Sequence, residues 1–267
     1  GTKPEFRCGF VEKVTMGLRR FLKHGEGLVE RTPLREVVLT AGGKLARQLA
    51  EFSPLEKLSG LELSKNGFGD AGIKLLTKST YLANLRRLRI HKNELRTEGA
   101  LALAESSYLG NLTSLDLTNN QLGDGGVEAI VQSPTFSRLQ SLVMPYCRFF
   151  DRSVAAIAKS PHMSNLVRLD LSSNRLDNAD FGQFSASNHL GNLQWLSLSY
   201  SNAPDEALQA MAASNSFSSL STLGLNINRI ADTGLQALAA SPLLSQLVDL
   251  RLSQNPITLA GVEALLA

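Results

Sequence analysis

A leucine recurs every 27 residues along most of this chain, and each copy opens the phrase L-x-x-L-x-L-x-x-N or a close variant. Clear copies are LSGLELSKN at residues 58–66, LTSLDLTNN at 112–120 and LVRLDLSSN at 166–174. Self-similarity at a fixed period of this length indicates a solenoid, in which each repeat packs only on its neighbours. The eight opening leucines are Leu58, Leu85, Leu112, Leu139, Leu166, Leu193, Leu220 and Leu247.

Each repeat contains the pattern of a strand followed by that of a helix. Leu61 and Leu63 alternate with polar residues, which predicts a half-buried strand. Successive strands must run parallel, because about 20 residues of each repeat remain for the return. The return carries apolar residues at helical spacing, as in Val127 and Ile130. The sequence therefore predicts a row of parallel strands joined by helices.

The helical return resembles that of ribonuclease-inhibitor-like leucine-rich repeat proteins. The resemblance covers residues 58–267 and includes the phrases EGALALA at 98–104 and DTGLQALAA at 232–240. It implies an α/β leucine-rich repeat solenoid, shaped like a horseshoe and built from 27-residue repeats. In that fold a parallel β-sheet lines the concave face and the helices cover the convex face.

Three polar positions recur in most repeats, and we interpret all three as structural. An Asn where the chain leaves the strand can satisfy backbone N–H and C=O groups. These residues are Asn66, Asn93, Asn120, Asn174, Asn228 and Asn255. The second position holds helix N-cap types, which we expect to accept from the first N–H groups of the helix they open. These are Asp70, Thr97, Asp124, Asp151, Asn178, Asp205 and Asp232. A serine closes each repeat and is interpreted as a helix terminator, not a nucleophile: Ser79, Ser106, Ser133, Ser160, Ser187, Ser214 and Ser241.

Residues 1–57 are less regular than the remainder. We interpret them as an N-terminal cap of irregular shortened repeats, followed by eight leucine-rich repeats over 58–267 in the same solenoid. Residues 11–16 and 34–39 look like two further strands, and 17–31 reads as an amphipathic helix between them. CGFVEKVT at 8–15 and the segment 21–39 resemble the opening of bacterial repeat-companion-domain proteins. In these proteins a short N-terminal domain of unknown function precedes such repeats.

Composition excludes several classes of function. A net charge of +3 is too small to argue for nucleic acid, and no apolar run approaches the ~18–20 residues that span a bilayer. Cys8, expected in a strand of the cap, and Cys147 lie too far apart for a disulfide framework, so we expect a reducing, cytoplasmic location. A targeting segment outside these residues is compatible with that expectation.

Signatures of catalysis are missing from the sequence. The four histidines lie in different repeats and never at the spacing of metal ligands. There is no phosphate-binding G-x-x-x-x-G-K-[ST] and no G-x-S-x-G. Cys147 occupies a position of the recurrent Asn, where Cys is a common substitute. We therefore expect no enzymatic activity, no cofactor, no metal and no small-molecule substrate.

Repeats four and six depart together from the pattern. In both, the recurrent Asn is replaced, a tyrosine precedes the replacement, and an apolar residue occupies an outward strand position. These residues are Cys147, Tyr146 and Val143 in repeat four, and Ser201, Tyr200 and Trp195 in repeat six. Departures from a locally consistent sequence are candidates for function.

The two tyrosines belong to a predicted column that continues through Ser173 between them and an exposed Ile227 beyond them. Strands lie ~4.8 Å apart, so Tyr146 and Tyr200 should be ~10 Å from one another. Aromatic side chains on a rigid concave surface are typical of protein interfaces. The alternative is that the rings simply cover the sheet. We interpret five residues as partner-binding: Val143, Tyr146, Trp195, Tyr200 and Ile227.

A basic patch lies upstream, at outward positions of repeats one and two. It comprises Lys65, Arg87, Arg89, His91 and Lys92. One interpretation is a solvated face with cross-strand ion pairs that contribute little each. The other is an electropositive end that steers an acidic partner, and it makes Arg87, Arg89 and Lys92 candidate partner-binding residues.

Three functions remain open. The first is a non-catalytic, monomeric scaffold that binds a protein or peptide, of unknown identity, on the concave face without nucleic acid or membrane. The second is the substrate-recognition arm of a larger bacterial enzyme or effector whose catalytic domain lies outside these residues. The third is a scaffold that assembles with itself through a poorly capped C-terminus.

Overall fold

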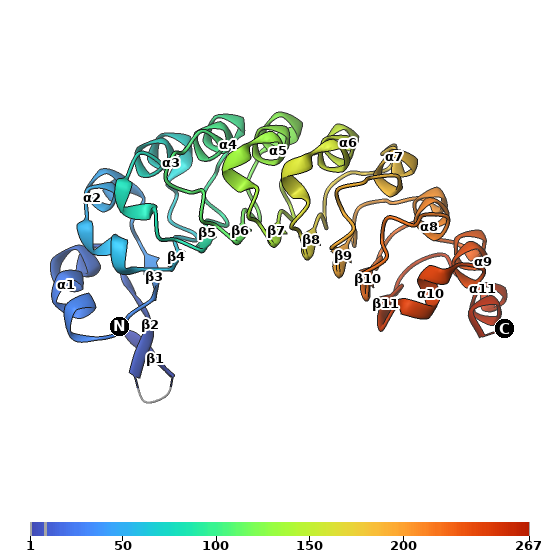
Figure 1. Ribbon diagram of the computed structural model, residues 1–267, viewed down its shortest axis with the longest axis horizontal. Helices are drawn as coiled ribbons and strands as arrows, with labels where there is room; N and C mark the ends of the chain where they lie inside the picture. The colour runs from blue at the N-terminus through green and yellow to red at the C-terminus, as the bar shows by residue number, and fades with distance from the viewer. Residues whose placement is uncertain (1, 8–9, 267) are drawn as a thin grey trace.

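The computed structural model describes residues 2–7 and 10–266, which form one solenoid bent into an arch (Figure 1). The two ends of the chain lie at opposite ends of the arch. Cys8, expected in a strand of the cap, lies outside the described residues.

Within the described residues, one sheet of eleven strands lies along the inner side of the arch (Figure 1). The strands lie in chain order, and all neighbours except β1 and β2 are parallel. Leu61 lies beside Leu88, and Leu88 beside Leu115, so equivalent residues of successive repeats are paired. The strands are β1 Lys3–Arg7, β2 Phe10–Gly17, β3 Glu36–Thr40, β4 Gly60–Glu62, β5 Arg87–Arg89, β6 Ser114–Asp116, β7 Ser141–Val143, β8 Arg168–Asp170, β9 Trp195–Ser197, β10 Thr222–Gly224 and β11 Asp249–Arg251.

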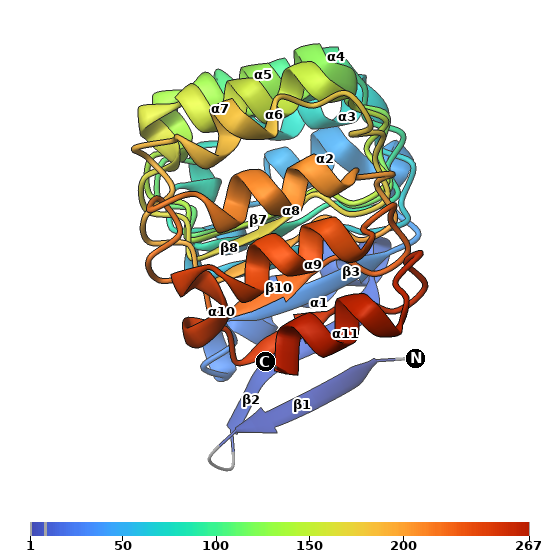
Figure 2. The same ribbon diagram turned by 90° about the vertical axis from the view of Figure 1, so that its right-hand side faces the viewer.

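Helices cover the outer side of the arch, stacked one beside the next (Figure 2). The expected arrangement, with the parallel sheet concave and the helices convex, is confirmed. The helices are α1 Leu18–Arg31, α2 Ala46–Ala50, α3 Gly69–Leu76, α4 Thr97–Ala104, α5 Gly123–Gln132, α6 Asp151–Lys159, α7 Phe181–Ser185, α8 Asp205–Ala212, α9 Asp232–Ala239, α10 Pro242–Gln246 and α11 Leu259–Leu266. Short 3-10 turns cover Gly43–Leu45, Ser53–Lys57, Thr80–Leu82, Pro134–Phe136 and Pro161–Met163.

A continuous apolar core fills the space between sheet and helices. The leucines of the first seven repeats and the helix residues at helical spacing are buried in it, as are large rings such as Phe136 and Phe184, whereas Leu247, Leu250 and Leu252 of the last repeat are only partly buried. Since each repeat presents its apolar side chains to the same interior, the core extends along the solenoid with the number of repeats.

The recurrent Asn forms a ladder between repeats. The Asn120 side chain donates to Leu117 O at 2.7 Å and to Ile90 O at 3.2 Å. Its Oδ1 accepts from the backbone N–H groups of Asn93 and Leu95. A buried amide therefore satisfies the backbone groups that each turn leaves exposed, as expected from the sequence.

The recurrent acids cap helices, but not the helices that contain them. Asp70 lies inside α3, and its Oδ1 accepts from Arg96 N at 2.8 Å and Gly99 N at 2.9 Å, at the start of α4 in the next repeat. The expectation that each acid caps its own helix is thus wrong here. Asp70 is the second residue of α3, and its carboxylate reaches the N-terminus of the neighbouring helix α4. For α7 the capping residue is Asp180, not Asn178.

The closing serines form a second ladder. Ser106 Oγ donates to Thr77 O at 2.8 Å, at the end of the helix in the preceding repeat. Ser79, Ser133, Ser160, Ser187, Ser214 and Ser241 each bond to the equivalent carbonyl. These hydroxyls satisfy helix C-terminal carbonyls and so are structural.

The N-terminal region contains the two predicted strands, as β2 and β3, and the predicted helix, as α1. It also contains β1, which the sequence did not reveal and which pairs antiparallel with β2. Figures 1 and 2 show this hairpin at the end of the arch. The division into a cap over 1–57 and eight repeats over 58–267 stays an interpretation. Among the described residues, no helix is both long and apolar enough to cross a bilayer.

Candidate binding groove

A groove of about 920 Å³ runs along the edge of the sheet where the chain leaves β4 to β9. Two rows of residues line it. Row one holds the residue just before each recurrent Asn or its replacement, called the ladder position below: Lys65, Lys92, Asn119, Tyr146, Ser173 and Tyr200. Row two follows that position: Gly67, Glu94, Gln121, Arg148, Arg175 and Asn202. The ladder side chain between them turns inward, so both flanking residues are placed at the surface.

Every residue of row one has a left-handed backbone, with φ between 54° and 60°. Asn119 tolerates this conformation, whereas tyrosine and lysine adopt it rarely. Ile227 continues the row beyond the groove at φ 55°, and a β-branched residue there is strained. The fold thus dictates the backbone of row one but leaves its side chains free to serve another purpose.

The aromatic part of the groove is exposed. Tyr146 is 55% exposed and Tyr200 is 56% exposed, and Phe150 adds a third accessible ring. Ser173, the small residue predicted between the tyrosines, lies in the same groove. The backbones of the two tyrosines lie two strands apart, about 10 Å, and the space above the strand between them, at Ser173, is called the notch below.

Beneath the tyrosines, the ladder continues with other residues. Cys147 Sγ donates to Leu117 O at 3.1 Å, and Ser201 Oγ donates to Leu171 O at 3.4 Å. Burial raises the pKa of the Cys147 thiol to about 12. A thiol that stays protonated at neutral pH is a poor nucleophile, which agrees with a structural role.

The cations of the groove fall into two kinds. Arg148 donates to Gln121 Oε1 at 3.1 Å, and Arg175 pairs with Asp177 at 3.6 Å. Lys65 and Lys92 are exposed and have no ion-pair partner among the described residues. One end of the groove therefore presents two unpaired ammonium groups, while at the aromatic end Arg175 is ion-paired and Arg148 is hydrogen-bonded to a neutral amide.

The other two basic candidates, Arg87 and Arg89, lie on the sheet face outside the groove. Arg87 pairs with Glu36 at 2.9 Å, and Arg89 pairs with Glu62 at 3.5 Å. Their charges are partly neutralised within the chain, so the predicted basic patch divides into a paired part on the sheet and an unpaired part in the groove.

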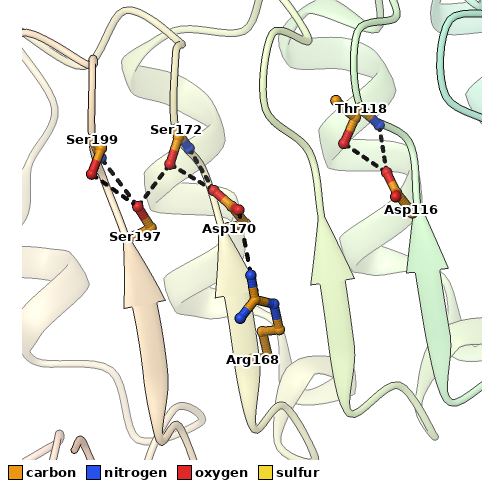
Figure 3. Close-up of polar contacts among 7 residues, drawn as sticks. All are labelled: Asp116, Thr118, Arg168, Asp170, Ser172, Ser197 and Ser199. Carbon is orange, nitrogen blue, oxygen red and sulfur yellow. Dashed lines mark hydrogen bonds and ion pairs between the residues drawn. The ribbon is translucent and has the colours of Figure 1, made fainter. Parts of the chain in front are cut away.

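The sheet face around Trp195 is a network of mutual contacts. The Arg168 guanidinium lies 3.4 Å from the centre of the Trp195 ring, and its Nη2 is 3.8 Å from Asp170 Oδ2. Figure 3 shows Asp170 accepting from Ser172, which in turn contacts Ser197. Partial burial lowers the pKa of Arg168, and the Asp170 charge opposes that effect. Trp195 thus faces outward as predicted, but it is half-buried and covered by a cation.

The remaining predicted residues lie apart from the groove. Val143 is half-buried on β7, between Asp116 and Asp170 on the adjacent strands. Ile227 was predicted to be exposed, and the structure places it half-buried, flanked in its row by Tyr200 and Gln254. Of the eight predicted partner-binding residues, the groove brings together Tyr146, Tyr200 and Lys92.

Sequence reasoning missed row two and Phe150. The sequence did contain a signal for row two. The position one residue after each recurrent Asn or its replacement holds Glu94, Gln121, Arg148 and Arg175 in four successive repeats, so its residue type varies. A position without a fixed residue type in a regular repeat is one that the fold does not specify. Over residues 2–7 and 10–266 no group of His, Cys, Asp and Glu is arranged to hold a metal ion.

Comparison with known proteins supports the fold. A family model described as "Leucine Rich repeat" matches residues 56–76, 81–104, 111–131, 162–180 and 245–266, together less than half of the chain. No curated protein matches the sequence.

Solved structures share the architecture at low identity. An internalin (inlF) from Listeria monocytogenes has a TM-score of 0.55 and 20% identity, over 87% of this chain and 65% of that one. Internalin C2 from the same species gives 0.55 and 20%, over 84% of this chain and 88% of its own. A TLR13–ssRNA13 complex gives 0.57 and 23%, over 87% of this chain and 35% of that one. This chain therefore spans less than two thirds of inlF and about a third of TLR13. At these identities the likeness concerns the fold alone: this chain has the fold of an α/β leucine-rich repeat solenoid.

Proposed function

We propose that this chain is a non-catalytic scaffold that binds a protein or peptide in the groove along the edge of its concave sheet. The observation that carries the proposal is the pair of exposed tyrosines, Tyr146 and Tyr200, held at fixed spacing on a rigid sheet edge. Rigid aromatic anchors bury large area at little cost in conformational entropy, so a few of them can dominate an interface. The comparisons do not favour the alternative that this chain is the substrate-recognition arm of a larger bacterial enzyme or effector. We also propose that its repeats are of the ribonuclease-inhibitor-like subtype.

The test replaces both tyrosines by asparagine. Asn occurs at the same row position at Asn119 with the same left-handed backbone, so Tyr146→Asn/Tyr200→Asn removes the rings without adding strain. We expect the free energy of unfolding to change by less than about 0.5 kcal/mol. Partner recovery in affinity capture from a lysate of the producing cells should fall at least about tenfold.

Val248→Ala is the matched control, because Val248 is 88% exposed but lies far from the groove. Its set of captured proteins should equal that of the unaltered chain. If the double variant retained the same partners in the same amounts, the groove would not be the binding surface.

A further inference from the structure

We infer that the groove takes an extended peptide of about seven residues that carries acidic side chains at one end and an apolar side chain about four residues away. This inference rests on the proposed function and specifies the chemistry of the partner. It is carried by two exposed lysines without ion-pair partners among the described residues at one end of the groove, Lys65 and Lys92, and by exposed rings toward the other end.

The length of the peptide follows from the spacing of the strands. Lys65 and Tyr200 stand five strands apart in row one, which corresponds to about 24 Å at ~4.8 Å per strand. An extended chain advances ~3.3 Å per residue, so about seven residues cover the groove.

The acidic end is assigned by charge complementarity. Lys65 and Lys92 are neighbours in row one, and neither has an ion-pair partner in the part of the chain that the structure describes. Carboxylates of a ligand would supply the missing ion-pair partners of these two lysines. At the opposite end, Asp177 partly neutralises Arg175 at 3.6 Å, whereas Arg148 donates only to the neutral Gln121 amide.

The apolar end is assigned by the notch between Tyr146 and Tyr200. Ser173, in the repeat between those of the two tyrosines, lines the same groove, and its small side chain takes up less of that space than a longer one would. Ser173 lies three strands from Lys92, about 14 Å, or about four extended residues. Apolar burial between two fixed rings supplies the anchor that two surface charges alone lack.

The middle of the groove suits a peptide backbone. Asn119 and Gln121 present amide side chains there, and an amide both donates and accepts, as a peptide group does. A single-stranded nucleic acid fits less well, because its phosphates recur along the whole strand. Those phosphates that lie in the middle of the groove would face the uncharged amides of Asn119 and Gln121.

The test is selection of random heptapeptides displayed on phage against the full chain. We expect enrichment of Asp or Glu near one end and of an apolar residue about four positions away. The Lys65→Glu/Lys92→Glu variant should select Lys or Arg at the position that was acidic and keep the apolar preference. The Tyr146→Asn/Tyr200→Asn variant should lose the apolar preference and keep the acidic one.

The control for charge reversal is Lys74→Glu/Lys78→Glu, at two exposed lysines on the convex side, which should select the original peptides. A labelled synthetic copy of the best peptide should bind the Lys65→Glu/Lys92→Glu variant at least about tenfold more weakly. Its affinity for the unaltered chain should fall as NaCl rises from about 50 to about 300 mM.

Three outcomes overturn the inference. They are the absence of any enriched peptide, enrichment without acidic residues, and a short oligouridylate that binds the groove more tightly than every selected peptide. Proteins captured through the tyrosines, together with peptides lacking acidic residues, would uphold the proposed function and refute this inference. Loss of tyrosine-dependent capture together with failure of the selection would refute both.

Discussion

The sheet face and row one of the groove are adjacent surfaces of the same repeats, and they differ in how their charged side chains are paired. On the sheet face Arg87, Arg89 and Arg168 each have an acidic partner in the chain. In the groove Lys65 and Lys92 have none among the described residues. Neighbouring strands hold sheet-face side chains at contact distance, whereas the turn at row one directs its side chains away from such partners. A concave face can therefore be full of charges and still offer few of them to a ligand.

The largest effect expected from this difference concerns Asp170. Its Oδ1 accepts from the backbone N and Oγ of Ser172, and its other oxygen faces Arg168. Asp170→Ala leaves these groups without their acceptor, and we expect the free energy of unfolding to fall by about 2 kcal/mol. Urea denaturation followed by circular dichroism measures this change.

Lys92→Ala is the matched groove substitution, and it should change the free energy of unfolding by less than about 0.5 kcal/mol. Equal losses in the two variants would mean that the groove and the sheet face do not differ as described.

A smaller effect, expected at alkaline pH, tests whether Cys147, which lies beneath the groove, is shielded from solvent in the folded chain. The pKa of the buried Cys147 thiol is raised to about 12, whereas a thiol in the unfolded chain ionises near pH 8.5. Between these values the unfolded chain binds fewer protons than the folded chain, so stability is complete below about pH 8.5 and is lost as the pH rises. At pH 9.5 the loss should be about 1.4 kcal/mol.

Cys147→Ser is the control, since its hydroxyl does not ionise in this range. As the pH rises from about 8 to about 9.5, the unaltered chain should lose stability relative to Cys147→Ser. A difference that is constant with pH would show that the thiol is accessible to solvent when the chain is folded.

The sequence predicted the fold well because a repeat multiplies every weak local signal. The strands, helices and Asn ladder each follow from residue types at a fixed spacing. It predicted the site less well, because exposure depends on what neighbouring strands present. Trp195 faces outward as expected, yet Arg168 on the adjacent strand covers it. Asp70 was assigned to the wrong helix for a similar reason, since its partner lies one repeat away.

The smallest expected effect concerns Ile227, in row one beyond the groove. Its φ of 55° is a strained conformation for a β-branched residue, and Asn119 shows which residue type suits that position. Ile227 is half-buried and does not belong to the apolar core, so little packing is lost when it is replaced. Ile227→Asn should therefore raise the free energy of unfolding by about 0.5–1 kcal/mol, and Asn119→Ile should lower it by a similar amount. Opposite signs in urea denaturation would show that row one accepts strain for the sake of its side chains. A loss of stability in Ile227→Asn would show instead that the isoleucine packs on its neighbours as sheet-face residues do, and the distinction between the two surfaces would end at Tyr200.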